Sequence, residues 1–329
     1  MRIIRHYEHG GPEVLRLEEV DTPTPGPGEV LIRAEAIGVN FADVQKRQGL
    51  PMGGRARLPG APGGDVAGTV AALGEGVTTA RIGDRVVAGI WDSAYADYVI
   101  APAEQLFFIP AGINAAQATA LPSPGQTAYH ALQSGGRLQP GDTVLIDAAA
   151  GGVGHLAVQI AKAMGAGTVI ATAGSQAKLD FVKSLGADHA FDYTRDDWTD
   201  KVLDVTGGRG VDVLLETVGN DILTKSIGVV AAFGRLVFYG AAGAVPGSTI
   251  PAVNVLSLIE MKAVTGFSLF AIMSKRPDVY AAGQADLIDM VASGRVKPII
   301  HAELPLADAA KAHELMEARA QLGKVVLVP

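Results

Sequence analysis

The sequence predicts an α/β protein in which a β-rich domain is interrupted by a doubly wound domain with a parallel sheet. The chain has 329 residues, a length that suits two domains. Short strands between Gly- and Pro-rich turns occupy its first third, and strands alternate with helices in its middle. Hydrophobic residues make up 48% of the chain and charged residues only 19%, so a sizeable core is expected.

The first third has the features of a small β-barrel or sandwich. Strands are expected at residues 29–34, 66–73 and 85–89. Each follows a stretch rich in turn-forming residues. Helical periodicity is scarce before about residue 114.

The middle of the chain alternates between the two types of element. Strands are expected at residues 143–148, 168–173, 211–216 and 235–240. A helix follows each of the first two strands, ending at Met164 and at residue 185, and a helix of about ten residues separates the last two. Such alternation is typical of βαβ units, which place parallel strands in one sheet.

The end of the chain mixes both types. A helix at 286–293 is closed by Gly294, helical spacing returns over 306–320, and a strand is expected at 324–328. We therefore expect the C-terminal segment to return to the first domain.

The strongest motif is an Ala- and Gly-rich loop between a predicted strand and a predicted helix. Its expected cofactor-binding residues are Gly151, Gly152, Val153 and Gly154. Glycine lets backbone N–H groups approach a pyrophosphate, and the start of the helix then faces the anion. Ala157 occupies the third glycine position of the dinucleotide fingerprint, a variant that still permits close packing. The alternative interpretation is a tight turn without a ligand.

The segment after the second strand of the α/β part bears on the choice of dinucleotide. NAD-binding folds place Asp or Glu there to bind the ribose 2′-OH, and residues 172–178 contain neither. Ser175 and Lys178 supply a hydroxyl and an ammonium, which suit a 2′-phosphate. Tyr193 and Arg195 follow the third strand, where a loop reaches the same phosphate. Together these residues favour NADPH, although either charged side chain alone is equally explained as solvated.

The composition argues against several other classes of protein. The chain has no cysteine, which excludes disulfides, a cysteine nucleophile and zinc sites with Cys ligands. Its net charge of −7 disfavours non-specific nucleic-acid binding. Its seven histidines show no metal-ligand spacing, and no Gly-x-Ser-x-Gly motif indicates a hydrolase. No segment has the features of a signal peptide or a membrane span, so a cytoplasmic protein without nucleic-acid or membrane partners is expected.

Several further blocks of the sequence are distinctive: residues 38–43 (GVNFAD), 63–68 (GGDVAG), 83–86 (GDRV), 125–129 (GQTAY) and 323–327 (GKVVL). Together with the glycine loop, they resemble the zinc-free quinone oxidoreductases of the medium-chain dehydrogenase/reductase superfamily, a group that includes zeta-crystallin-like proteins. The resemblance covers essentially the whole chain. It implies a GroES-like catalytic domain at 1–122 and 266–329, a Rossmann NADP-binding domain at 123–265, and a homodimer or homotetramer.

The resemblance also bears on zinc. Zinc-dependent relatives hold a catalytic zinc through a Cys and a Gly-His-Glu segment, and the matching positions here are Asn40 and Gly63-Gly64-Asp65. Alcohol oxidation assisted by zinc is therefore not expected, and no metal is expected. Hydride transfer from NADPH to a quinone or to the β-carbon of an enone requires only hydrogen-bond donors for the developing negative charge.

The resemblance implies a set of site residues. Asn40, Asp43 and Thr127 are the expected catalytic residues, with the Asn40 amide directed at the nicotinamide or the substrate carbonyl and the Thr127 hydroxyl near the nicotinamide carboxamide. A structural role, at the start of a loop or helix, stays open for each of them. Besides Asn40 and Thr127, the cofactor is expected to contact residues near the fifth strand and the C-terminus: Phe238, Tyr239, Gly240, Phe267, Ser268, Leu269 and Lys324.

Departures from the family leave the proton donor and the substrate open. Two family tyrosines are replaced by Gln45 and Pro51, so water is an alternative proton source. Arg55 and Arg57 form a basic segment that suits an anionic substrate such as an acyl-CoA, and a mobile surface loop is the alternative interpretation. The leading hypothesis is an NADPH-dependent reductase of quinones or enones. An enoyl-thioester reductase and a non-catalytic NADPH-binding protein are the alternatives, and residues 245–250 are a candidate lead into a dimerisation strand.

Overall fold

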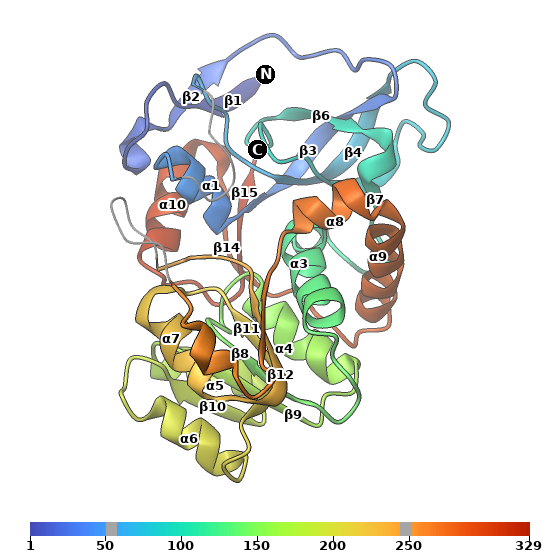
Figure 1. Ribbon diagram of the computed structural model, residues 1–329. Coiled ribbons are helices and arrows are strands. Elements are labelled where there is room, and N and C mark those ends of the chain that lie inside the picture. The colour runs from blue at the N-terminus through green and yellow to red at the C-terminus, as the bar shows by residue number, and fades with distance from the viewer. Residues whose placement is uncertain (51–57, 244–251) are drawn as a thin grey trace. The chain divides into compact units, whose positions relative to one another are not determined.

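The structure, a computed structural model, describes residues 1–50, 58–243 and 252–329. The chain forms two compact units, Met1–Pro124 with Pro298–Pro329, and Gly125–Lys297 (Figure 1). The domain limits expected at 122/123 and 265/266 stay a prediction, and this division places residues 266–297 in the second unit. Pro51, Arg55, Arg57 and the segment 245–250 lie outside the described residues.

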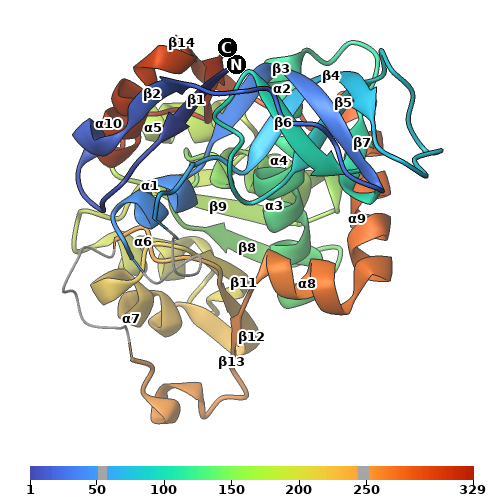
Figure 2. The ribbon, with the colours of Figure 1, turned by 90° about the horizontal axis from the view of Figure 1, so that it is seen from above.

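The first unit is built on a seven-stranded sheet in the order β14–β15–β3–β4–β5–β7, with β6 paired to β3, in the part of the chain that the structure describes. Strands β3, β4, β5 and β7 of this sheet can be followed in Figure 2. All pairs are antiparallel except β14 with β15. A separate antiparallel pair joins β1 to β2. The elements are β1 (Arg2–Arg5), β2 (Arg16–Glu19), β3 (Glu29–Val39), β4 (Asp65–Leu73), β5 (Arg85–Gly89), β6 (Tyr98–Pro102), β7 (Leu106–Phe108), β14 (Ile300–Pro305), β15 (Lys324–Val328), α1 (Phe41–Arg47), α2 (Ala115–Ala118) and α10 (Ala309–Glu317).

Strand β3 is central to this sheet because it pairs with β4, β6 and β15. It was expected to end at residue 34 but continues to Val39. Its second half is buried and bonded to neighbours on both sides, Ile37 for example facing both Val66 and Leu327. Alanines and Gly38 weaken the strand signal there, so tertiary pairing rather than local propensity sets the end of the strand.

The second unit contains a parallel six-stranded sheet in the order β10–β9–β8–β11–β12–β13. In chain order its strands run 3-2-1-4-5-6, the order of dinucleotide-binding folds, in which the connecting helices cover both faces of the sheet. The elements are β8 (Thr143–Ile146), β9 (Thr168–Ala173), β10 (His189–Asp192), β11 (Val211–Glu216), β12 (Val230–Phe238), β13 (Ala263–Gly266), α3 (Gln126–His130), α4 (Gly154–Ala163), α5 (Gln176–Ser184), α6 (Trp198–Val205), α7 (Asn220–Gly228), α8 (Leu269–Lys275) and α9 (Pro277–Ala292).

Two helices differ from their expected limits. Helix α9 begins at Pro277, nine residues before the expected start, because Pro at the first helical position and Asp278 in the first turn favour an N-terminus there. Helix α10 covers only Ala309–Glu317 of the expected 306–320, since Pro305 is followed by a single tighter turn.

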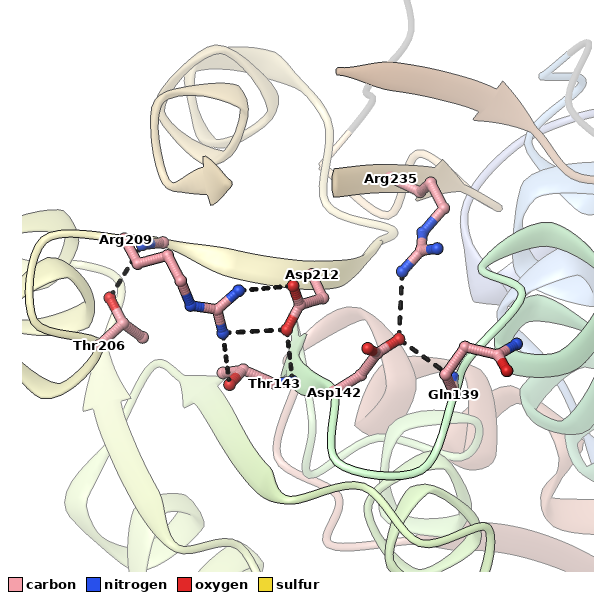
Figure 3. Close-up of polar contacts among 8 residues, drawn as sticks. Gln139, Asp142, Thr143, Thr206, Arg209, Asp212 and Arg235 are labelled. Atoms are coloured by element: carbon pink, nitrogen blue, oxygen red, sulfur yellow. Dashed lines mark hydrogen bonds and ion pairs between the residues drawn. The ribbon is translucent and has the colours of Figure 1, made fainter. Parts of the chain in front are cut away.

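Charged side chains connect the amino ends of the parallel strands. Arg209 donates to both carboxylate oxygens of Asp212, at 2.6 and 3.0 Å, and to the Thr143 hydroxyl at 3.2 Å (Figure 3). Arg235 of β12 donates to Asp142 at 3.1 Å. These contacts hold the starts of β8 and β11 together and leave the carboxyl ends of the strands for the loops expected to bind ligand.

Two buried carboxyl groups lie near the carboxyl ends of β8 and β11. Asp147 accepts hydrogen bonds from the hydroxyls of Thr172 at 2.5 Å and Ser226 at 3.1 Å. Glu216 accepts two backbone N–H groups of the following turn, at 2.7 and 2.8 Å. Burial raises the pKa of Asp147 to about 6. Burial, with a further contribution from the charge of Asp147, raises the pKa of Glu216 to about 8.

We predict that Glu216→Gln stabilises the protein at alkaline pH. The pKa of Glu216 is higher in the folded than in the unfolded state, so its contribution to stability is fully present below the unfolded pKa and is lost as the pH rises through about 8. Gln keeps the accepting oxygen and does not ionise. The free energy of unfolding at pH 9 should rise by on the order of 2 kcal/mol, measured by thermal or denaturant unfolding, and change little at pH 5. Exposed Glu303→Gln is the control; equal stability of Glu216→Gln and wild type at pH 9 would contradict the prediction.

Candidate functional site

A buried polar cluster lies in the first unit where β15, β3 and β4 meet. Asn40, the residue between β3 and α1, donates its Nδ2 to Asp65 Oδ2 at 2.6 Å and accepts Lys324 Nζ at its Oδ1 at 2.5 Å. Asp65 also accepts Lys324 Nζ at 3.3 Å and the hydroxyl of Ser123 at 2.5 Å. Asp65 is 0% and Lys324 1% exposed, and this burial lowers the pKa of Lys324 against the opposing effect of Asp65. The sequence-predicted residues Asn40 and Lys324 are therefore direct neighbours.

Asp43 fixes the start of α1. Its carboxylate accepts the backbone N–H of Asn40 at 2.9 Å, an arrangement typical of a helix cap, and the hydroxyl of Tyr95 at 3.3 Å. The Tyr95 oxygen also lies 3.1 Å from Nε2 of His313. All three side chains are buried, and burial raises the pKa of Asp43 to about 6 and lowers that of His313 to about 3. These contacts support the structural role for Asp43, while its expected catalytic role stays a prediction.

In the second unit, the glycine loop connects β8 to α4 as expected. Ala148 has a positive φ of 49°, which makes the turn tight. A Cβ on Gly154 would lie 2.6 Å from backbone atoms of Ala148 and Ala149, so the turn itself requires glycine there. A Cβ on Gly152 would meet nothing within 4 Å. The loop therefore has an open side at Gly152 and a closely packed side at Gly154.

The residues expected to bind a 2′-phosphate are gathered at one corner of the second unit. Ser175 is exposed and precedes α5, and Lys178 lies in the first turn of that helix. The strands β9 and β10 are neighbours, which brings Tyr193 beside the end of β9; its hydroxyl oxygen lies 3.3 Å from the position of a Cβ on Gly174. Arg195 is exposed and forms an ion pair with Asp197 at 3.6 Å.

Of the three residues expected at the end of the fifth strand, only the first lies within that strand. Phe238 is the last residue of β12, whereas Tyr239 and Gly240, expected inside the strand, lie beyond its end. The backbone N–H of Tyr239 still donates to Glu216 O at 3.0 Å. Phe267, just after β13, donates its N–H to Phe238 O at 2.8 Å, so these two expected residues are neighbours.

The other expected residues of the second unit lie at helices. Ser268 caps the N-terminus of α8, where its hydroxyl accepts the N–H of Ala271 at 3.3 Å, and Leu269 is the first residue of that helix. Thr127 lies half-buried in α3. A structural role at a helix is thus supported for Ser268.

Three polar members of the first unit were missed from the sequence: Ser123, Tyr95 and His313. None lies in a motif, and Tyr95 and His313 are 218 residues apart in the chain. Asp65 was considered only as a position that lacks a zinc ligand. The available signal was its position, a carboxylate between a Gly-Gly pair and the strand predicted at 66–73.

Across the described ranges, no helix combines the length and the apolar character required to cross a membrane. In the same ranges, no group of three or more His, Asp or Glu side chains is placed to hold a metal ion. The residues at the zinc-ligand positions also have a donor set that does not fit zinc. Asp65 already accepts hydrogen bonds from Asn40 and Ser123 and faces the Lys324 ammonium, a competing cation.

Comparisons with known proteins agree with this geometry. The family model for the alcohol dehydrogenase GroES-like domain matches residues 26–111, and that for zinc-binding dehydrogenases matches 152–284. A 2-haloacrylate reductase from Burkholderia is 35% identical over 98% of this chain and 97% of its own. A quinone oxidoreductase from Pseudomonas aeruginosa is 36% identical over 99% of both chains. The crystal structure of Escherichia coli quinone oxidoreductase complexed with NADPH is 33% identical, with a TM-score of 0.92 over 100% of both chains.

These relatives cover practically the whole chain, so the likeness is not confined to one of the two units. They confirm the predicted fold class, a GroES-like domain combined with a Rossmann domain that has a parallel sheet. The chain therefore belongs to the zinc-independent quinone oxidoreductases of the medium-chain dehydrogenase/reductase superfamily.

Proposed function

We propose that this protein is an NADPH-dependent reductase that transfers hydride to a quinone or to an α,β-unsaturated carbonyl without zinc. The observation that carries the proposal is the glycine loop, which opens a helix at the carboxyl edge of a 3-2-1-4-5-6 sheet. The NADPH bound to the similar Escherichia coli quinone oxidoreductase supports the same cofactor here.

The second unit offers suitable groups for each anionic part of NADPH. The pyrophosphate is assigned to the backbone of residues 151–154, with the open side of the loop at Gly152. The 2′-phosphate is assigned to Ser175, Lys178 and Tyr193. Lys178 supports this assignment because a cation in the first turn of a helix is unfavourable by itself, and an anionic ligand offsets that effect.

The reaction requires stabilisation of the negative charge that develops on the acceptor oxygen. Bound NADPH supplies the hydride. The Asn40 amide has two N–H groups, and among the described residues Asp65 accepts one of them; the other is assigned to the acceptor oxygen. Asp43 is enclosed by Asn40 and Tyr95, which makes solvent the simpler source of the proton.

The acceptor class follows from what the named relatives share. A quinone and a 2-haloacrylate each carry a C=C bond conjugated with a carbonyl or carboxyl group. Hydride addition to such a bond gives an enolate-like or hydroquinone-like product whose charge is delocalised. This chemistry needs hydrogen-bond donors rather than a Lewis acid.

Oxidation of the reduced nicotinamide, followed by its absorbance, tests the proposed function. We expect turnover of NADPH with a benzoquinone or 2-cyclohexenone and much slower turnover with NADH. Turnover of crotonyl-CoA alone would support the enoyl-thioester reductase instead. NADPH binding without turnover of any of these acceptors would contradict the reductase proposal and support a non-catalytic protein.

The cofactor assignment has its own test. Ser175→Asp places a carboxylate where the 2′-phosphate is expected, so we predict that KM for NADPH rises at least tenfold, roughly 1.4 kcal/mol or more, while KM for NADH falls or is unchanged. Ser184→Asp, an exposed serine at the other end of α5, is the matched control. Equal effects of the two substitutions on the NADPH/NADH ratio would contradict the assignment.

We also propose that the protein is a homodimer formed through the β13 edge of the second unit. Large apolar side chains that are at least 70% exposed cluster in sequence around β12, η5 (Val255–Leu258) and β13: Phe233, Val255, Leu256, Ile259 and Met261. Exposed apolar patches of this kind mark interaction surfaces. Strand β13 is an edge strand within the described part of the sheet, which leaves its outer side unpaired.

The dimer can be tested by light scattering after gel filtration. The double substitution Leu256→Asp/Ile259→Asp should shift the mass from about twice 33.9 kDa to that of the monomer. Val205→Asp, at an exposed apolar residue of α6, should leave the dimer intact. A monomeric wild type, or a double variant that remains dimeric, would contradict the proposal.

A further inference from the structure

Lys324 reaches Asp65 by crossing over the strand between them. In the sheet, β3 lies between β15, which carries Lys324, and β4, which carries Asp65. Gly38 of β3 is paired with Val326 on one side and with Asp65 on the other. A Cβ on Gly38 would lie 2.7 Å from Lys324 Cε and 2.9 Å from Lys324 Nζ. The lysine side chain therefore passes over β3 at a position that has no side chain.

The two charged groups determine how the Asn40 amide is oriented. An ammonium only donates hydrogen bonds and a carboxylate only accepts them, so Oδ1 of Asn40 must face Lys324 and Nδ2 must face Asp65. Rotation of the amide by half a turn would place its NH2 group against the Lys324 ammonium and its oxygen against the Asp65 carboxylate. The hydrogen bond from the ammonium to Oδ1 also polarises the amide and strengthens its N–H groups as donors.

We propose that Lys324 and Asp65 are positioning residues that hold and polarise the Asn40 amide, and that Gly38 provides the space this arrangement requires. The inference rests on the proposed reductase function, in which the second N–H of Asn40 binds the acceptor oxygen. Lys324 then acts through Asn40, and its ammonium is not required to touch the cofactor. The charges of Lys324 and Asp65 balance each other, which explains how both are buried together.

Gly38→Ala is the most direct test because it changes no charged group. Its methyl group must displace the end of Lys324. We expect kcat to fall at least tenfold while KM for NADPH stays within about threefold. Lys324→Met should cause the same fall in kcat. The control Lys311→Met, at an exposed lysine of α10, should leave kcat and KM unchanged. A rise in KM for NADPH with unchanged kcat would overturn the proposal, because Lys324 would then bind the cofactor.

A double-mutant cycle separates positioning from a general effect on stability. In an Asn40→Ala background, Lys324→Met should cause no further loss of kcat, since the group through which it acts is absent. Fully additive losses would overturn the proposal. Lys324→Met leaves Asp65 buried without its partner, so the charge-neutral pair Lys324→Met/Asp65→Asn provides a second variant that should fold and should show the same loss.

Nuclear magnetic resonance tests the positioning of Asn40 without turnover. If the wild type reduces no acceptor, the proposed function is wrong. The side-chain amide resonances of Asn40 then still show whether Lys324 and Asp65 position this amide. We expect two well-separated amide proton shifts in the wild type and a collapse toward free-amide values in Gly38→Ala and Lys324→Met. Unchanged Asn40 shifts in both variants would overturn the proposal.

Discussion

The buried ion pair between Lys324 and Asp65 is the interaction on which the first unit depends most. It joins side chains that are 259 residues apart in the chain, one from each of the two segments that make up this unit. Each charge alone would be strongly unfavourable in the core, so the pair requires β15 to lie next to β3 in one register. The placement of Asn40 follows from this register, because the amide completes the contacts of both groups.

The second unit divides its polar groups between the two ends of its parallel sheet. The amino ends carry Arg209, Asp212 and Arg235 in ion pairs that hold strands together. The carboxyl ends carry backbone turns, the glycine loop and the buried carboxyl groups of Asp147 and Glu216. Salt bridges at the first end stabilise the fold, and the turns at the second end present backbone N–H groups, which suit an anionic ligand.

Most elements of the second unit could be predicted from the sequence because its strands are continuous apolar runs flanked by turn residues. The glycine loop was found for the same reason, since its chemistry is local. The polar cluster of the first unit was not found as a cluster, because Ser123 and Lys324 meet Asp65 only through tertiary pairing. Likewise, pairing with neighbouring strands extends β3 to Val39, beyond residue 34, where the sequence predicts its end.

The division of the first unit into two segments has a consequence for the order in which the protein forms. Asp65 emerges from the ribosome 259 residues before Lys324, and synthesis of that length takes roughly 10–50 s. During this interval the part of β3 that pairs with β15 lacks that partner strand, and Asp65 of β4 has no Lys324 beside it. The whole second unit is made in the same interval and is free to fold first. The residues of β15 thus complete the sheet. Until β15 is made, the nascent protein has to keep the unpaired edge of β3 from pairing with other chains.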